Sequence, residues 1–307
     1  MGRFPCQSAL LSLFVCGLAA IPAIAQEPIF RDSTTLVRVV VTVKDPKGQT
    51  IGDLQETDFK LYDSGVRQAI RVFEHHTEIP LSISILIDTS GSTNKDLGYE
   101  TNSVEKFIKA LLKEGNPEDA VSLYSFNHEV ILQADFNRRL TRLQNALGHL
   151  KAEAGTSLYD AVYLAGRHME KRDGRHVMII VTDGGDTTSK EDFQAALRAV
   201  QLSESIVYPI LVTPILGEPG RNLGGERVLA QLASTTGGRV FEPTSANQLD
   251  RNFQEILRDL RTQYLLAFRP ENLPPNLPDF HPIRVETSRP ELKVSTRSGY
   301  YGDNRGR

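Results

Sequence analysis

The most constraining feature of this sequence is an alternation of short apolar runs with amphipathic segments through its middle. Residues 83–87 and 177–181 are short, largely apolar runs of strand length, while residues 104–112 and 158–169 carry apolar side chains at helical spacing. Such apolar runs are typical of parallel strands that are covered on both faces. Strands that alternate with helices predict an α/β fold with a mostly parallel central sheet and helices on both of its faces.

The same alternation extends over residues 79–260, which we predict to be one α/β domain. The other predicted strands are residues 121–126, 130–132, 206–212 and 239–241, and the other predicted helices are residues 140–150, 193–202, 227–234 and 249–260. Residues 214–225 are rich in Gly and Pro and are predicted to be a loop.

Two segments with strand patterns flank this domain, residues 26–78 before it and residues 261–307 after it. Their predicted strands are residues 37–44, 59–62, 69–73, 264–268, 283–287 and 292–294. Either segment alone is too small for a good core. We therefore predict that they pair into one small β-sandwich, with the α/β domain inserted into it.

Residues 1–25 have the pattern of a secretory signal peptide. One basic residue, Arg3, precedes an apolar run over residues 9–21, and the segment ends in Ala23-Ile24-Ala25. We predict cleavage after Ala25 and export to the periplasm or the cell exterior. Two alternatives stay open: a retained anchor, or lipidation at Cys16 in place of that cleavage.

The remaining composition excludes several classes of function. Both cysteines, Cys6 and Cys16, lie in the signal segment, so the mature chain is predicted to have no disulfide. A net charge of −3 gives no electrostatic footprint for nucleic acid or an anionic membrane. No later apolar stretch approaches the length of a membrane span.

Oxygen-bearing side chains gather where the predicted strands end and one helix begins. Asp88, Ser90 and Ser92 follow one strand, Asp183 follows another, and Thr156 directly precedes the helix at residues 158–169. Ligands of open parallel sheets bind beyond the carboxyl ends of the strands. An all-oxygen set suits Mg²⁺, Mn²⁺ or Ca²⁺ and argues against zinc or copper. The sequence therefore predicts a metal site made by Asp88, Ser90, Ser92, Thr156 and Asp183.

The proposed donor set leaves room for a further ligand. Two carboxylates balance the charge of a divalent ion, and an octahedral ion held by three hydroxyls and two waters has one position left. A carboxylate from a partner protein is the expected occupant of that position. Asp160, Asp186 and Asp192 lie nearby in sequence, and we interpret them as charges at helix starts or in a solvated loop. Two alternatives stay open: a supporting role for Asp160 in the metal site, and a second ion near Asp186 and Asp192.

The five residues resemble the metal-ion-dependent adhesion site of von Willebrand factor type A domains. This sequence fills all five positions of that motif. The resemblance covers about residues 80–260 and implies a Rossmann-like fold in which Ser90 and Ser92 contact the ion directly. It also implies that Asp88, Thr156 and Asp183 bind directly or through water. The flanking segments further resemble exported proteins of acidobacterial type that are related to this family. In related domains the last helix can shift when the site is occupied, and for residues 249–260 of this chain such a shift is a hypothesis.

Three functions follow as hypotheses. The first is a metal-dependent protein-binding or adhesion module whose partner offers Asp or Glu to the ion. The second is a structural envelope protein in which the ion only stabilises the domain. The third, a metal-assisted hydrolase, is disfavoured because the sequence contains no G-x-S-x-G, H-E-x-x-H or P-loop pattern. We therefore expect a protein that is not an enzyme.

Overall fold

The apolar runs of the sequence form the centre of a five-stranded sheet. The computed structural model describes residues 36–75, 79–93, 97–212 and 223–302, without the side chain of Ser92. In the order β7-β6-β5-β8-β9, the strands are Val130–Asn137, Ala120–Phe126, Leu81–Asp88, Arg175–Thr182 and Ile206–Leu211. All neighbouring strands run parallel except β7, which is antiparallel to β6. The predicted, mostly parallel sheet is confirmed.

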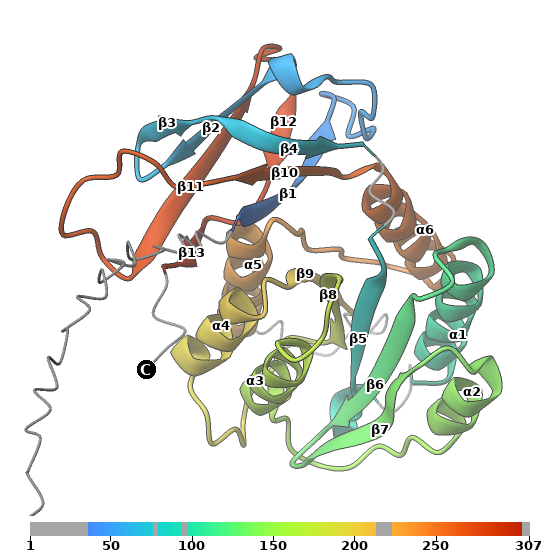
Figure 1. Cartoon of the computed structure of the whole chain (residues 1–307). Coiled ribbons are helices and arrows are strands. Elements are labelled where there is room, and N and C mark those ends of the chain that lie inside the picture. The colour runs from blue at the N-terminus through green and yellow to red at the C-terminus, as the bar shows by residue number, and fades with distance from the viewer. Residues whose placement is uncertain (1–35, 76–78, 94–96, 213–222, 303–307) are drawn as a thin grey trace, which may run out of the picture. The chain divides into compact units, whose positions relative to one another are not determined.

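The described part of the chain has six α-helices, and they cover both faces of this sheet (Figure 1). On one face lie α1, α2 and α6, with bounds Leu97–Glu114, Leu140–Gly148 and Ala246–Thr262. On the other lie α3, α4 and α5, with bounds Leu158–Met169, Phe193–Leu202 and Leu223–Thr236. Successive residues of β5 enter the two cores in turn, Ile85 on the α1 side and Leu86 on the α3 side. Burial on both faces explains why the central strands are almost entirely apolar.

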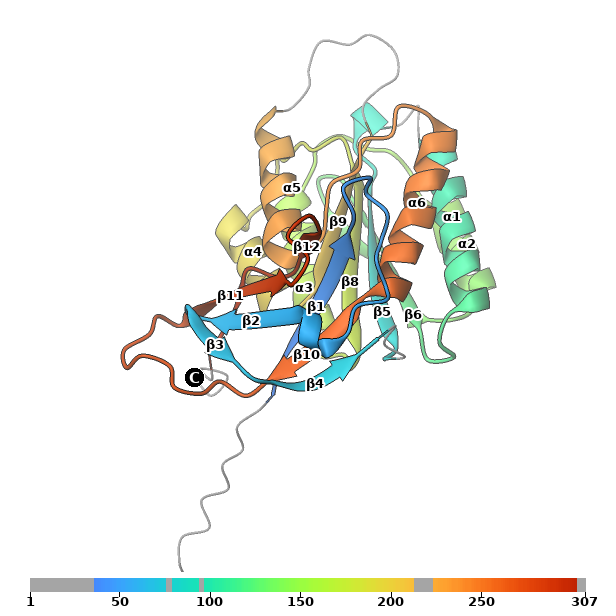
Figure 2. The same cartoon turned by 90° about the horizontal axis from the view of Figure 1, so that it is seen from above.

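The two flanking segments pair into a β-sandwich, as predicted. One sheet has the order β12-β1-β10-β4, with bounds Lys293–Ser295, Val37–Lys44, Tyr264–Phe268 and Ile70–Glu74. The other has the order β13-β11-β2-β3, with bounds Gly299–Tyr301, Phe280–Thr287, Phe59–Asp63 and Val66–Gln68. N-terminal β1 is antiparallel to C-terminal β10, and β2 to β11. The sheets share one apolar core, so the α/β domain is inserted between paired strands (Figure 2).

One predicted strand does not form. Residues 239–241 make a single parallel bridge, between Phe241 and Ile210 at the end of β9. Pro243 follows two residues later and has no backbone N–H, so a ladder cannot extend beyond this point. The side chain of Arg239 instead forms ion pairs with Glu255 and Asp259 of α6.

Several boundaries differ from the sequence prediction, and among the helices those of α1 and α5 differ most. Helix α1 begins at Leu97, about two turns before residue 104. The prediction omits these turns because Leu97 and Tyr99 are their only apolar residues before residue 104, too few to show a helical period. Helix α5 begins at Leu223, inside the predicted loop, and residues 213–222 of that loop lie outside the described residues. The signal-peptide prediction also lies outside them. No helix in the described ranges has the length and apolar character to cross a membrane.

Candidate functional site

The candidate site lies at the carboxyl ends of two adjacent parallel strands. Strand β5 ends at Asp88 and its neighbour β8 ends at Thr182, with Ile87 opposite Val181 in the register. This register brings Asp88 beside Thr182, and Asp183 is the residue that follows Thr182 in the chain. The predicted convergence of the two strand ends is therefore present in the structure.

Asp88 is a fully buried carboxylate whose hydrogen-bond partners are neutral groups of two residues, Ser90 and Thr182. Its exposed fraction is 0%; Oδ1 accepts a hydrogen bond from the backbone N–H of Ser90 at 2.8 Å and Oδ2 one from the Thr182 hydroxyl at 2.6 Å. Burial raises the pKa of Asp88 from 3.8 to about 6, against the lowering effect of hydrogen bonds from Thr182 and Ser90. The negative charge of Asp183 also contributes to this raised pKa, as the smallest of its causes.

The turn after β5 is locked by hydrogen bonds to the backbone. Residues Gly91–Thr93 form a short 3₁₀ helix, and the hydroxyl of Thr93 donates to the carbonyl oxygens of Asp88 and Ser90 at 3.1 and 3.0 Å. The side chain of Ser90 is buried and also hydrogen-bonds to Asp88. The backbone of Ser92 belongs to the 3₁₀ helix, but its side chain lies outside the part of the chain that the structure describes.

Thr156 is buried beneath the loop that follows β8. Its backbone N–H donates to the Thr187 hydroxyl at 3.0 Å, and its carbonyl oxygen accepts from the N–H groups of Thr187 and Thr188 at 2.8 and 3.1 Å. Gly155 has a φ of +85°, and a Cβ there would lie 2.9 Å from the Cβ of His128. The segment before α3 is thereby fixed between the loops that follow β6 and β8.

Asp183 is half-buried and lies in a loop that packs against α5. Its Oδ1 accepts from the N–H of Gly185 at 3.2 Å. Gly184 has a φ of +92°, and a Cβ on Gly225 would lie 1.4 Å from the Gly184 carbonyl oxygen. These glycines therefore allow close packing of two backbones at the start of α5.

The other acidic residues near the site have structural partners. Asp192 caps α4 by accepting from the N–H of Ala195, as a charge at a helix start would. Asp160 instead accepts from the N–H groups of Lys190 and Glu191, so it fixes the β8–α4 loop to α3. Asp186 accepts from the N–H of Tyr159 and the hydroxyl of Ser189. The interpretation of Asp160 as a simple helix-start charge is incomplete.

The donors gathered here suit a hard divalent ion better than a soft one. Asp88, Ser90, Thr156 and Asp183 offer oxygen atoms alone, and the described residues contain no group of three or more His, Cys, Asp or Glu side chains placed to hold a metal. A site of hydroxyls and two carboxylates fits Mg²⁺, Mn²⁺ or Ca²⁺. The buried Asp88 carboxylate, held by neutral donors, is also a charge that a cation would stabilise.

The sequence reasoning missed the residues that hold the donors in place. Thr182 receives no role from the motif, yet its hydroxyl donates to Asp88 and accepts from the N–H of Gly184 at 3.0 Å. Thr187 and Thr188 likewise position Thr156. A signal was available for Thr182, since it is the last residue of an apolar strand and directly precedes Asp183. None marks Thr187 or Thr188, because their role depends on how the loop folds back.

Comparison with solved structures finds similar folds in several bacterial proteins. The PilB minor pilin from Streptococcus sanguinis is 13% identical over 60% of this chain and 62% of the pilin, with a TM-score of 0.46. The vWF domain of the type V pili tip protein Mfa5 from Porphyromonas gingivalis is 13% identical over 58% of this chain and 95% of that domain, with a TM-score of 0.46. The conserved hypothetical protein BatB from Bacteroides thetaiotaomicron is 17% identical over 59% of this chain and all of that one, with a TM-score of 0.45.

A comparison with curated proteins gives no match. The family model of the von Willebrand factor type A domain matches residues 82–256, which is more than half of the chain. The match begins in β5, six residues before Asp88, and ends within α6, so it includes both strand ends of the candidate site. The chain belongs to the von Willebrand factor type A domain family.

Proposed function

We propose that this protein is a metal-dependent protein-binding module of an exported protein. A divalent cation, Mg²⁺ in the first place and Mn²⁺ or Ca²⁺ as alternatives, is held by Asp88, Ser90, Ser92, Thr156 and Asp183. When bound, the ion supplies a positive centre that an Asp or Glu side chain of a partner protein completes. The observation that supports this function best is the buried carboxylate of Asp88 beside Asp183 at the end of the sheet.

The electrostatics of the site favour a cation. The hydrogen bonds to the Asp88 carboxylate come from neutral donors, namely the backbone N–H and the side chain of Ser90 and the hydroxyl of Thr182. A buried negative charge without a compensating positive charge is costly, and a second carboxylate nearby adds repulsion. A divalent ion removes both costs, because its charge equals the sum of the two carboxylates. The locked loops around Thr156 and Ser90 keep the donors in place without the ion.

The hydroxyl of Ser157, the residue after Thr156, is not arranged as a nucleophile. The Ser157 hydroxyl lies 3.2 Å from the carbonyl oxygen of His128 and 2.8 Å from the hydroxyl of Thr188, rather than against an imidazole or a carboxylate. Nucleophilic serines are recognised by a hydrogen-bonded base that a third group orients. The proposal is therefore binding without catalysis. Export relies on the predicted signal peptide, and the partner is expected outside the cytoplasm.

The first experiment is calorimetric titration of residues 26–307 with Mg²⁺ and with Mn²⁺. The parent chain is compared with the double variant Ser90→Ala/Ser92→Ala and with Ser234→Ala, an exposed serine of α5 that serves as control. We expect binding to the parent and to the control and none to the double variant. A partner is then sought by affinity capture from the exported fraction, with and without EDTA.

The outcomes separate the three functions. Metal binding together with a partner that is released by EDTA and does not bind the double variant supports the adhesion module. Metal binding that raises stability, with no metal-dependent partner, supports a purely stabilising ion instead. Equal metal binding by the parent and the double variant would show that these hydroxyls do not form the site.

A further inference from the structure

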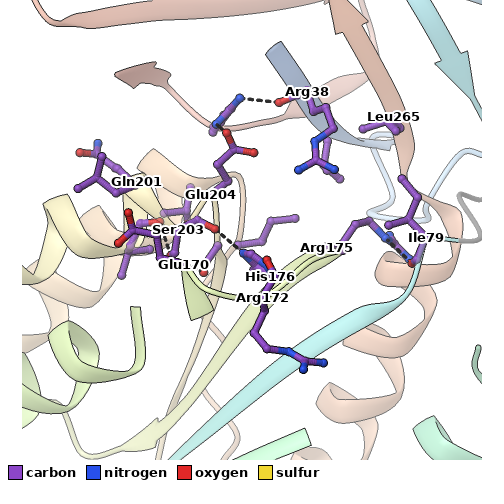
Figure 3. A pocket seen from close by; sticks show the side chains of 18 of the residues that line it. Arg38, Ile79, Glu170, Arg172, Arg175, His176, Gln201, Ser203, Glu204 and Leu265 are labelled. Carbon is purple, nitrogen blue, oxygen red and sulfur yellow. Dashed lines mark hydrogen bonds and ion pairs between the residues drawn. The ribbon is translucent and has the colours of Figure 1, made fainter. Parts of the chain in front are cut away.

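A second site lies at the opposite end of the central sheet. A cavity of about 400 Å³ opens between the sandwich and the α/β domain, next to the first residues of β8 (Figure 3). The eight residues of β8, at about 3.3 Å each, place this cavity roughly 25 Å from the strand end at Thr182. Its volume falls within the range of about 300–1,000 Å³ typical of small-molecule sites, which are frequent at domain junctions.

The alternation of two sandwich strands creates this cavity. Val39 and Val41 of β1 point into the sandwich core, so Arg38 and Val40 between them face the α/β domain. On the paired strand β10, Leu265 also faces away from the sandwich core and lines the cavity. This face of the sheet meets the ends of α4 and α5 without filling the space between them.

Arg297 brings a poorly satisfied guanidinium group to the cavity wall. Its side chain is only 11% exposed; Nη2 donates to the carbonyl oxygen of Arg38 at 2.5 Å, and Nη1 lies 3.3 Å from a carboxylate oxygen of Glu204. Within the described residues, Nε and Nη1 of Arg297 make no hydrogen bond. Buried donors without acceptors are costly, so this group favours an additional oxygen ligand.

Arg38 adds a second guanidinium group whose charge has no ion-pair partner among the described residues. In Figure 3 it extends from β1 into the space above Arg175 and His176. Those two side chains have structural tasks: Arg175 donates to the Leu260 carbonyl oxygen at 2.9 Å, and both His176 ring nitrogens lie within hydrogen-bonding distance of backbone carbonyl oxygens. A third lining arginine, Arg172, donates to the Ser82 hydroxyl at 3.2 Å and lies over the ring of Phe136. The donors left for a ligand are therefore those of Arg38 and the Nε and Nη1 groups of Arg297, although Arg297 also lies beside Glu204.

The remaining walls define the rest of the ligand. Leu36, Val40, Val200, Ile206 and Leu265 give the cavity an apolar lining. Two of the lining carboxylates are already paired, Glu204 with Arg297 and Glu170 with Arg167. Asp173, in the loop between α3 and β8, is a third lining carboxylate and offsets one positive charge.

We propose that this cavity binds a small organic carboxylate with an apolar body, its anionic head on Arg38 and Arg297 and its body against the apolar walls. Carboxylate geometry matches the planar fork of a guanidinium group, which donates two parallel hydrogen bonds. The cavity is separate in space from the metal site, and its binding of a carboxylate needs no ion.

Calorimetric titration of residues 26–307 with octanoate, octanol and octylamine in EDTA tests this proposal. The three probes share one apolar chain and differ in the head group. We expect octanoate to bind at least tenfold more tightly than octanol, and octylamine to bind no better than octanol. Arg38→Gln removes one charge-assisted hydrogen-bond donor, and a loss of about 1.5 kcal/mol corresponds to an affinity about tenfold weaker.

Two further variants complete the test. Arg297→Lys keeps the buried charge but loses the bidentate geometry, and we expect it to weaken octanoate binding as well. Arg142→Gln changes an exposed arginine on α2, far from the cavity lining, and should leave the affinity for octanoate unchanged. Circular dichroism confirms that each variant is folded. No octanoate binding to the parent, equal binding of octanol, or equal affinity of the parent and Arg38→Gln would each overturn the proposal.

Discussion

Replacement of Asp88 by Asn should stabilise the metal-free protein at neutral pH and abolish its response to metal. The parent buries a carboxylate whose pKa is raised from 3.8 to about 6, chiefly by burial. At about 1.4 kcal/mol per pH unit, this rise corresponds to about 3 kcal/mol of native-state stability that is lost when the group ionises. An uncharged side chain of the same shape avoids this loss.

The pH dependence follows from the direction of the shift. Below pH 3.8 the carboxyl group is protonated in the folded and the unfolded chain, and it makes no difference to stability. Between pH 3.8 and 6 the unfolded chain releases the proton first, so the free energy of unfolding of the parent falls as pH rises. The variant lacks this dependence. The difference between the two proteins should therefore open over this window and stay constant above it.

Part of the gain is offset by a poorer hydrogen-bond arrangement. The Asn carbonyl can accept from the N–H of Ser90, but its amide group then faces the Thr182 hydroxyl, which already accepts from Gly184. The loss of one hydrogen bond costs about 1 kcal/mol. We therefore expect Asp88→Asn to be more stable than the parent by about 2 kcal/mol at pH 7 in EDTA.

The assay is urea unfolding followed by circular dichroism at pH 4, 5, 6 and 7, in EDTA and in Mg²⁺. In Mg²⁺ at about 100 times its dissociation constant, the free energy of unfolding of the parent should rise by about 2.7 kcal/mol, and that of the variant should not change. A variant less stable than the parent at pH 7 in EDTA, or a difference that is constant from pH 4 to 7, would refute the reasoning. Either result would mean that burial of the Asp88 charge does not lower the stability of the metal-free protein.

Three further substitutions test the packing of the fold by urea unfolding. The Asp259 carboxylate is 3% exposed and lies 2.8 Å from the Lys44 amine. Asp259→Ala removes this partner of Lys44 and Arg239 and should lower the free energy of unfolding by about 3 kcal/mol. Asp259→Asn should lower it less, because Asn can keep the hydrogen bond from Thr50. Gly238→Ala places a Cβ 1.9 Å from the Val207 carbonyl oxygen and should cost about 3 kcal/mol, whereas Gly98→Ala, with nothing within 4 Å, should be neutral or stabilising by up to about 1 kcal/mol. Leu266→Ala empties a fully buried position in the sandwich and should cost about 2–5 kcal/mol, against under about 1 kcal/mol for the exposed Leu164→Ala. If Gly238→Ala or Leu266→Ala lowered the free energy of unfolding no more than its control, the corresponding packing contact would be contradicted. If Asp259→Ala lowered it less than Asp259→Asn, the role of Asp259 as a buried ion-pair partner would be contradicted.

Most of the α/β domain is predictable because its signals are local. The runs around Ile85 and Ile179 are apolar on both faces, and such runs are typical of the centre of a parallel sheet. The site residues Asp88 and Asp183 follow directly, since each comes after the end of its strand. Pairing of the flanking segments was also predictable, because neither could form a core alone.

The features that the sequence does not reveal depend on contacts between distant residues. Strand β13 consists of three residues and is fixed by pairing with β11, so no periodicity marks it. Thr187 is one of several polar residues in its loop, and only the folded loop brings its hydroxyl to Thr156. The cavity at Arg38 arises because one face of β1 meets a second domain. A period-2 pattern predicts which side chains of that strand lie on the same face, but it does not predict what the outer face contacts.

Helix α6 connects the two candidate sites. It starts five residues after Phe241, which pairs with Ile210 near the end of β9. Its 17 residues span about 25 Å and lead through Gln263 into β10. Near its end, Asp259 is bound to Lys44 of β1 and to Arg239, so the helix cannot slide without breaking buried ion pairs or moving β1 and β10 with it. The family resemblance implies that occupation of the metal site shifts this helix. If it does so here, the strands that carry Arg38 and Leu265 are the ones that move, and binding of metal and of carboxylate would then affect each other by the same factor in both directions.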